Sequence, residues 1–263
     1  MIRPALPRWL LVPAGVAALF LAVPLVAMFG RVSWARLPAL LVTPEALDAL
    51  WLSLRTCTAS TVLCLALGLP LAMVLARTRG RWATVGRVLA ALPMVLPPVV
   101  AGLALLVALG RRAWLGRQLS ILGVDLAFTT AAVIVAQTFV SMPFLVVSVE
   151  GALRSAQDDL DIVAATLGAS PTTVLRRITL PLAAPAIASG AALSFARALG
   201  EFGATLTFAG SLQGTTRTLP LEIYLARESD TDVAIALSVV LLVLATALVA
   251  ATAVFGRIRG AAR

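Results

Sequence analysis

Residues 233–256 read VAIALSVVLLVLATALVAATAVFG, an unbroken apolar run without one charged side chain. A helix needs about 20 such residues to cross the hydrocarbon core of a bilayer. Four more uncharged runs of similar length cover residues 9–30, 56–76, 88–110 and 126–149. A sixth region, 182–216, contains only Arg197 and Glu201 as charges and is too long for one simple span. We interpret it as one helix followed by a partly membrane-embedded segment.

The composition also indicates that lipid is the main solvent of this chain. Apolar residues make up 60 % of the 263 residues and charged residues only 13 %, whereas soluble domains have about 25 % charged residues. We therefore predict an all-α integral membrane protein with six transmembrane helices, forming one domain over residues 1–263. Residues 9–30 follow two arginines, as in a signal peptide, but the run is long and lacks a small-residue cleavage site. We interpret this run as a membrane helix.

Two residue types are missing, and their absence excludes several kinds of chemistry. The chain has no histidine, and all 21 of its basic residues are arginine. Without lysine there is no P-loop lysine and no Schiff base, and without histidine there is no Ser-His-Asp triad. Cys57 and Cys64 lie within an apolar run and are interpreted as small buried side chains. We expect no catalytic residue, no metal site and no cofactor in this chain.

The placement of the arginines predicts an orientation, because cytoplasmic loops of membrane proteins carry an excess of basic residues. With the N-terminus inside, the inside set is Arg3, Arg8, Arg77, Arg79, Arg81, Arg87, Arg154, Arg176, Arg177, Arg257, Arg259 and Arg263. The smaller outside set is Arg31, Arg36, Arg111, Arg112, Arg117, Arg217 and Arg227. This bias predicts that both termini are cytoplasmic. Because the arginines are scattered over several loops, the net charge of +9 does not indicate a nucleic-acid partner.

The long polar connection on the predicted inside covers residues 150–183 and is interpreted as two short helices. Asp158 is suited to cap the first helix, and Gly168 to end it in the left-handed conformation. Ser170 and Pro171 then begin a second helix, which Pro181 is expected to end. The first helix has an apolar face formed by Leu160, Val163, Ala164 and Leu167.

An exposed apolar face on such a loop has two interpretations. The helix lies on the membrane surface, or it docks onto another protein. Three nearby acids, Asp158, Asp159 and Asp161, would repel anionic lipid, which favours docking onto a protein.

The same loop resembles a known motif. Residues 164–170, AATLGAS, followed by Ile178-Thr179-Leu180-Pro181, are similar to the EAA loop of ABC importer permeases. That pattern has E-A-A, three residues, Gly, and later I-x-L-P; here Ile162 and Val163 replace its first two letters, and Asp161 is the nearest acid. The resemblance implies a cytoplasmic coupling helix that binds a groove of an ABC ATPase subunit. It assigns coupling roles to Asp161, Ala164, Ala165, Leu167, Gly168, Ala169, Ile178, Leu180 and Pro181.

Arg197 and Glu201 are four residues apart and therefore share one face of a helix. Charges at membrane depth are costly and usually face a bundle interior or a water-filled path. The pair either braces neighbouring helices or contributes to a substrate path. Small and hydroxyl residues nearby suit close helix packing and a polar route. The candidate path residues are Arg197, Gly200, Glu201, Gly203, Thr205 and Thr207.

A second resemblance covers nearly the whole chain. Residues 195–210 (FARALGEFGATLTFAG), 216–224 (TRTLPLEIY) and 96–102 (LPPVVAG) resemble molybdate permeases of bacterial ABC importers, which have the type I ABC-importer permease fold. The resemblance implies a homodimer in the plasma membrane, with the path between its two copies. It further implies a separate ABC ATPase subunit, and a periplasmic or lipid-anchored molybdate-binding protein outside. Such a subunit is no enzyme, because ATP is bound and hydrolysed by the partner.

Other functions are left open by these residues. Sulfate/thiosulfate and tungstate permeases of ABC importers share much of the pattern. A secondary transporter would be expected to have intramembrane carboxylates in both halves of the chain, whereas only Glu201 is found at depth. A membrane scaffold without transport activity would leave the polar loop unexplained.

Overall fold

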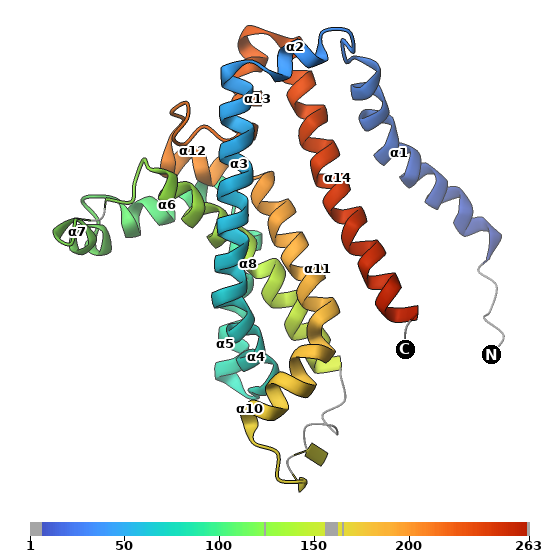
Figure 1. The fold of residues 1–263 in the computed structure, drawn as a ribbon, viewed down its shortest axis with the longest axis vertical. Coiled ribbons are helices and arrows are strands. Elements are labelled where there is room, and N and C mark those ends of the chain that lie inside the picture. The colour runs from blue at the N-terminus through green and yellow to red at the C-terminus, as the bar shows by residue number, and fades with distance from the viewer. Residues whose placement is uncertain (1–6, 124, 156–162, 165, 262–263) are drawn as a thin grey trace.

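The computed structural model describes residues 7–123, 125–155, 163–164 and 166–261, and these residues form helices and no strand (Figure 1). Five helical segments in this part of the chain are long and apolar enough to cross a membrane. They are Arg8–Gly30, Pro44–Arg77, Thr130–Ser155, Pro171–Leu199 and Thr231–Leu248. A sixth candidate is a bent pair, α5 (Arg81–Val95) and α6 (Pro98–Leu109). The predicted all-α membrane fold is confirmed.

The third predicted span, residues 88–110, is not one straight helix. Its halves α5 and α6 meet at an angle of 116°. Leu96 and Pro97 are both extended between them, with ψ of 135° and 136°. A residue before a proline avoids the helical conformation, so the Leu96-Pro97-Pro98 sequence turns the chain sharply.

Pro181 does not end the second loop helix, contrary to the sequence prediction. The helical path runs through α10 (Pro171–Val174) and the π-helical turn η3 (Leu175–Thr179) into α11 (Leu180–Leu199). An interior proline normally clashes with the carbonyl four residues before it. The wider π turn relieves this clash. The same order occurs earlier, where the π turn η2 (Cys64–Gly68) joins α3 (Pro44–Leu63) to α4 (Leu69–Arg77), which begins Leu69-Pro70.

α8 (Thr130–Ser155) is the central helix, and it contacts α3, α4, α5, α11 and α12 (Gly203–Ala209). Buried hydroxyls join the helices around it. The Ser194 hydroxyl donates to the Ser141 carbonyl at 2.9 Å, and the Thr138 hydroxyl donates to Ser60 Oγ at 3.2 Å. Such bonds hold helices together in lipid, where apolar burial between helices gives little driving force. Cys57 and Cys64 are buried free thiols at the same seam, as predicted.

α1 (Leu11–Gly30) stands apart from the other spans and has no buried residue (Figure 1). Its link to α3 passes through the short helix α2 (Leu37–Leu41). α14 (Thr231–Ala261) lies between α1 and the central helices in the view. The packed core of the molecule therefore begins at α3.

Gly190 on α11 is where α8 and α11 approach closely. A Cβ atom there would lie 3.1 Å from Leu145 Cδ1 and 3.2 Å from Leu145 Cα. We expect Gly190→Val to lower the free energy of unfolding by about 1–3 kcal/mol, because overpacking shifts the backbone. Gly151→Val on α8 is the matched control, since its Cβ would meet open space. The measurement is thermal unfolding in detergent. Equal unfolding temperatures for the two variants would contradict the close packing at Gly190.

Candidate functional site

The predicted site residues lie in two regions of the bundle (Figure 1). One region, the α10 end, holds α10 and the loop before it. The other, the α12 region, holds α6, α12 and α13 (Leu219–Ser229). The two regions are joined by α8 and α11.

At the α10 end, the predicted turn at Gly168 is confirmed. Gly168 has φ of 83°, in the left-handed region. The Ala169 N–H donates to the Ala164 carbonyl at 3.0 Å, which is the bond that closes a Schellman-type helix end. Two residues later, the Ser170 hydroxyl accepts a hydrogen bond from the Thr173 N–H, and Pro171 is the first helical residue, as predicted.

The apolar face before this turn is uncovered. Leu167 is 83 % exposed and Val163 is 54 % exposed. Of the other predicted coupling residues, Gly168 and Pro181 are exposed, and Ala164, Ala169, Ile178 and Leu180 are half-buried. Asp161 and Ala165 lie outside the described residues, as does Asp158, the predicted cap. α8 continues to Ser155 and α10 begins at Pro171, so both ends of the predicted connection 150–183 belong to longer helices. Between them, Val163, Ala164 and Thr166 are helical.

A cluster of charges that the sequence analysis did not single out forms the base of this loop. Arg87 on α5 donates to the carbonyls of Leu75 at 2.8 Å and Thr78 at 3.1 Å, and it also pairs with Glu150 on α8. Arg154 lies 3.5 Å from the same carboxylate. One guanidinium thus joins the end of α4 to α5 and α8. The sequence contains one indication of this cluster, which is that Arg87 and Glu150 each border an uncharged run.

A second bond links α4 to the helix that leaves the loop. The Arg77 guanidinium donates to the Thr179 hydroxyl in η3 at 3.0 Å. Movement of α10 and η3 is therefore connected directly to α4, and through Arg87 to α5 and α8.

In the α12 region, Arg197 and Glu201 form a buried ion pair. Arg197 Nη1 lies 2.6 Å from Glu201 Oε2, and the Glu201 side chain is 1 % exposed. Glu201 Oε1 also accepts a hydrogen bond from the Ala204 N–H at 2.8 Å, within the first turn of α12. The carboxylate therefore bridges the break between α11 and α12, which favours the bracing interpretation of this pair.

The helices α6 and α12 are packed almost backbone to backbone. A Cβ atom at Gly102 would lie 2.7 Å from the Ala204 carbonyl oxygen, and one at Gly203 would lie 2.7 Å from Pro98 Cβ. Two of the stretches that carry the family resemblance, 96–102 and 195–210, thus meet in space. The contact requires glycine at both positions.

The remaining candidate path residues surround this contact. Gly200 is exposed at the end of α11. The Thr207 hydroxyl is satisfied by the Gly203 carbonyl at 2.8 Å. Thr205 is fully buried, and its hydroxyl has no hydrogen-bond partner among the described residues.

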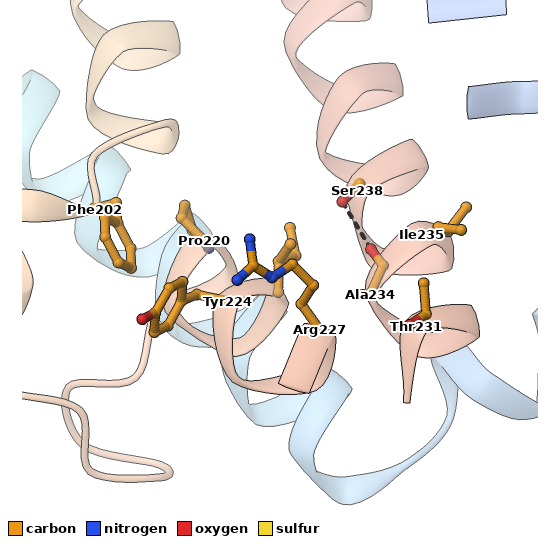
Figure 2. Close-up of a pocket in the computed structure, with 9 residues that line it drawn as sticks. Phe202, Pro220, Tyr224, Arg227, Thr231, Ala234, Ile235 and Ser238 are labelled. Carbon is orange, nitrogen blue, oxygen red and sulfur yellow. Dashed lines mark hydrogen bonds between the residues drawn. The ribbon is translucent and has the colours of Figure 1, made fainter. Parts of the chain in front are cut away.

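A pocket of about 510 Å³ opens between α13 and α14, beside the break after α11 (Figure 2). The Phe202 and Tyr224 rings lie 5.1 Å apart, and the Arg227 guanidinium is 5.8 Å from the Tyr224 ring centre. Arg227 already pairs with Glu228 at 2.7 Å. The remaining wall is largely apolar, so this pocket is not a cage for a free anion. Among the described residues, no group of potential metal ligands occurs.

Comparison with known families and structures identifies the kind of protein that carries these features. A family model described as "Binding-protein-dependent transport system inner membrane component" matches residues 68–259. This chain belongs to that family. The match includes the loop at the α10 end, the α6–α12 contact and the pocket between α13 and α14.

Two curated relatives of this family member are similar over most of its length. The molybdenum transport system permease protein ModB of Mycobacterium tuberculosis is 59 % identical over 244 residues, covering 93 % of this chain and 92 % of the relative. ModB of Escherichia coli K12 is 38 % identical over 186 residues, covering 70 % of this chain and 81 % of that protein.

Solved structures share the fold of the family member at low sequence identity. A bacterial alginate ABC transporter in complex with an alginate pentasaccharide-bound periplasmic protein matches with a TM-score of 0.72 and 17 % identity, covering 92 % of this chain and 91 % of that one. The MetNI methionine ABC transporter in an inward-facing conformation matches with a TM-score of 0.64 and 19 % identity. The match covers 81 % of this chain and 95 % of that one. These structures share the fold of this chain. The family match and the ModB relatives show that the chain is a permease subunit of an ABC importer.

The arginine at the base of the loop gives a direct test. We expect Arg87→Gln to lower the free energy of unfolding by about 1–3 kcal/mol, because it removes a charged donor from two carbonyls and from a buried carboxylate. Arg81→Gln on the same helix is the control, since Arg81 is exposed. Equal thermal unfolding of the two variants in detergent would show that this cluster does not hold the helix ends together.

The buried carboxylate of Glu201 in the α12 region allows a further test of stability. Glu201→Ala should destabilise the protein by about 3 kcal/mol, since it leaves Arg197 unpaired and uncaps α12. Glu201→Gln should cost less, because its amide oxygen still accepts from Ala204. Glu228→Gln, at an exposed pair, should have little effect. If Glu201→Gln and Glu201→Ala unfold at the same temperature, the hydrogen bond from the Ala204 N–H does not contribute to stability.

Proposed function

We propose that this chain is the membrane permease of an ATP-driven importer that moves molybdate across a bacterial plasma membrane. The observation that carries the proposal is the 59 % identity to a molybdenum permease across 93 % of the chain. The packing of stretches 96–102 and 195–210 against each other supports it, because the most specific part of the resemblance forms one structural unit.

The proposed assembly contains two copies of this chain with the path between them. Two copies of an ABC ATPase subunit bind at the α10 end, and an extracytoplasmic molybdate-binding protein delivers the anion on the other side. Both termini are then cytoplasmic. The exposed Leu167 and Val163 supply the apolar face that the ATPase covers.

Transport by alternating access needs a physical link between the ATPase and the path. The coupling loop leads into α10 and η3, which Arg77 joins to α4 through Thr179. From there α11 runs without interruption to Arg197 and the break at residues 200–202. Displacement of the coupling helix is thereby transmitted along one rigid helix to the α12 region.

The α12 region is the proposed gate. Here α5–α6 and α11–α12 both break, and their second halves pack together. A molybdate dianion at membrane depth needs donors that bind it weakly enough to release it. Thr205 has a buried hydroxyl that finds no partner among the described residues, which suits a donor that becomes available when the gate opens. Arg197, Gly200, Glu201, Gly203 and Thr207 position this region.

This chain supplies no group for ATP chemistry, and we propose that it needs no cofactor of its own. It has no lysine for a P-loop. Binding and hydrolysis of ATP are assigned to the separate ATPase subunit.

Uptake of labelled molybdate tests the substrate and the energy source. Cells that express the permease with its ATPase and binding protein should accumulate molybdate, and depletion of ATP should abolish uptake. Excess sulfate should compete weakly. Strong competition by sulfate would favour a sulfate/thiosulfate permease, and uptake driven by an ion gradient without ATP would favour a secondary transporter.

Gly168 gives a test of coupling. Gly168→Arg should insert into the membrane normally but transport at least about tenfold more slowly, because an arginine is strained at φ of 83° and obstructs the docking surface. Gly123→Arg is the matched control, since Gly123 is also left-handed with φ of 77° and open space around it, but lies after α7 (Trp114–Ile121). Normal ATP-dependent uptake by Gly168→Arg would contradict the assignment of the coupling turn.

A further inference from the structure

A cavity of about 450 Å³ lies at the turn between α6 and α7. It is separate from the coupling loop and from the pocket of Figure 2. Its wall contains two neighbouring arginines, Arg111 and Arg112, and the apolar side chains of Leu106, Val107 and Phe128.

The charge around this cavity is not balanced. Arg111 lies 3.3 Å from Asp125. Arg112 and Arg117 have no acidic partner in the part of the chain that the structure describes. In the proposed orientation these three arginines lie on the outer side, where basic residues are normally scarce. Arg112 in the cavity wall and Arg117 on α7 therefore favour an anionic partner from outside the chain.

Phe128 in the cavity wall has a strained backbone. Its φ is 63°, a conformation that bulky residues rarely adopt. Its N–H donates to the Phe208 carbonyl at 3.4 Å, and its ring lies 3.3 Å from the position of a Cβ at Gly210. The end of α12 therefore holds Phe128 in this conformation. Strain of this kind is found mainly where the surrounding structure fixes a side chain for binding.

The surface beside the cavity is apolar. Trp114 is 79 % exposed and Leu122 is 77 % exposed, and Val107 in the wall itself is also largely exposed. Trp114 and Arg117 lie on α7, Arg112 precedes it and Leu122 follows it. The segment thus combines basic and exposed apolar side chains, as segments in the membrane interface do. A water-soluble anion would make no favourable contact with these apolar side chains, whereas the acyl chains of a lipid pack against them.

We propose that the cavity at the α6–α7 turn binds the phosphate of an anionic membrane phospholipid. Arg111 and Arg112 hold the phosphate oxygens, since guanidinium groups suit phosphate geometry. The acyl chains lie against Val107 and Trp114. Only one of the arginines facing the cavity is balanced by an acid, so a headgroup with net negative charge is preferred over a zwitterionic one.

The full-length chain in nanodiscs tests this proposal. Discs of phosphatidylcholine alone are compared with discs that also contain phosphatidylglycerol, and lipid retained after extraction into detergent is measured by native mass spectrometry. The unaltered protein should retain phosphatidylglycerol and unfold at a higher temperature in the mixed discs. Arg112→Gln should bind phosphatidylglycerol about tenfold more weakly, because it loses a charge-assisted contact.

The matched control is Arg227→Gln, which removes another exposed arginine of the same predicted side, one already paired with Glu228. It should retain phosphatidylglycerol like the unaltered protein. Equal retention by Arg112→Gln and Arg227→Gln would overturn the proposal. So would saturable binding of inorganic phosphate or molybdate in lipid-free detergent that Arg112→Gln abolishes and phosphatidylglycerol does not displace. These measurements do not depend on transport, so they separate the lipid site from the proposed function.

Discussion

The contact between α6 and α12 leaves no room for a Cβ atom at Gly102 or Gly203, and the arrangement of the α12 region depends on it. Both helices follow a break in a longer apolar segment, and the break before α6 bends the chain by 116°. Each break frees backbone groups that lipid cannot satisfy. At the second break, the carboxylate of Glu201 accepts a hydrogen bond from the Ala204 N–H at the start of α12, and the two short helices pack closely against each other.

Charges in this protein have different roles at the two regions. At the α10 end, Arg87 gathers carbonyls and a carboxylate from separate helices into one cluster. In the α12 region, Arg197 and Glu201 are only four residues apart and hold a local break together. At the α6–α7 turn, Arg112 has no acidic partner within the described chain. Arg112 also lines the cavity at this turn, and it is there that we propose an anionic lipid binds.

Much of the fold follows from the sequence because lipid imposes a simple length rule on apolar runs. The spans predicted over residues 126–149 and 233–256 are found as α8, which begins at Thr130, and as α14. Gly168 and Ser170 were predicted from local capping rules, which act over a few residues and need no tertiary information. The 116° bend in residues 88–110 was missed because hydropathy is the same for straight and bent helices. Arg87 and Glu150 were missed because they meet only when α5 and α8 pack.

The π turn before Pro181 determines how far α10 is rotated about the helix axis relative to α11. A π turn contains one residue more than the corresponding α-helical stretch. Each residue of an α-helix advances the side chains by about 100° around the axis. The extra residue in Leu175–Thr179 therefore sets α10 out of phase with α11 by roughly that angle. If η3 lost one residue, the membrane spans would stay in place, but α10 and the coupling surface before it would be rotated about the helix axis. The length of this one turn thus sets the direction that the proposed ATPase-binding surface faces.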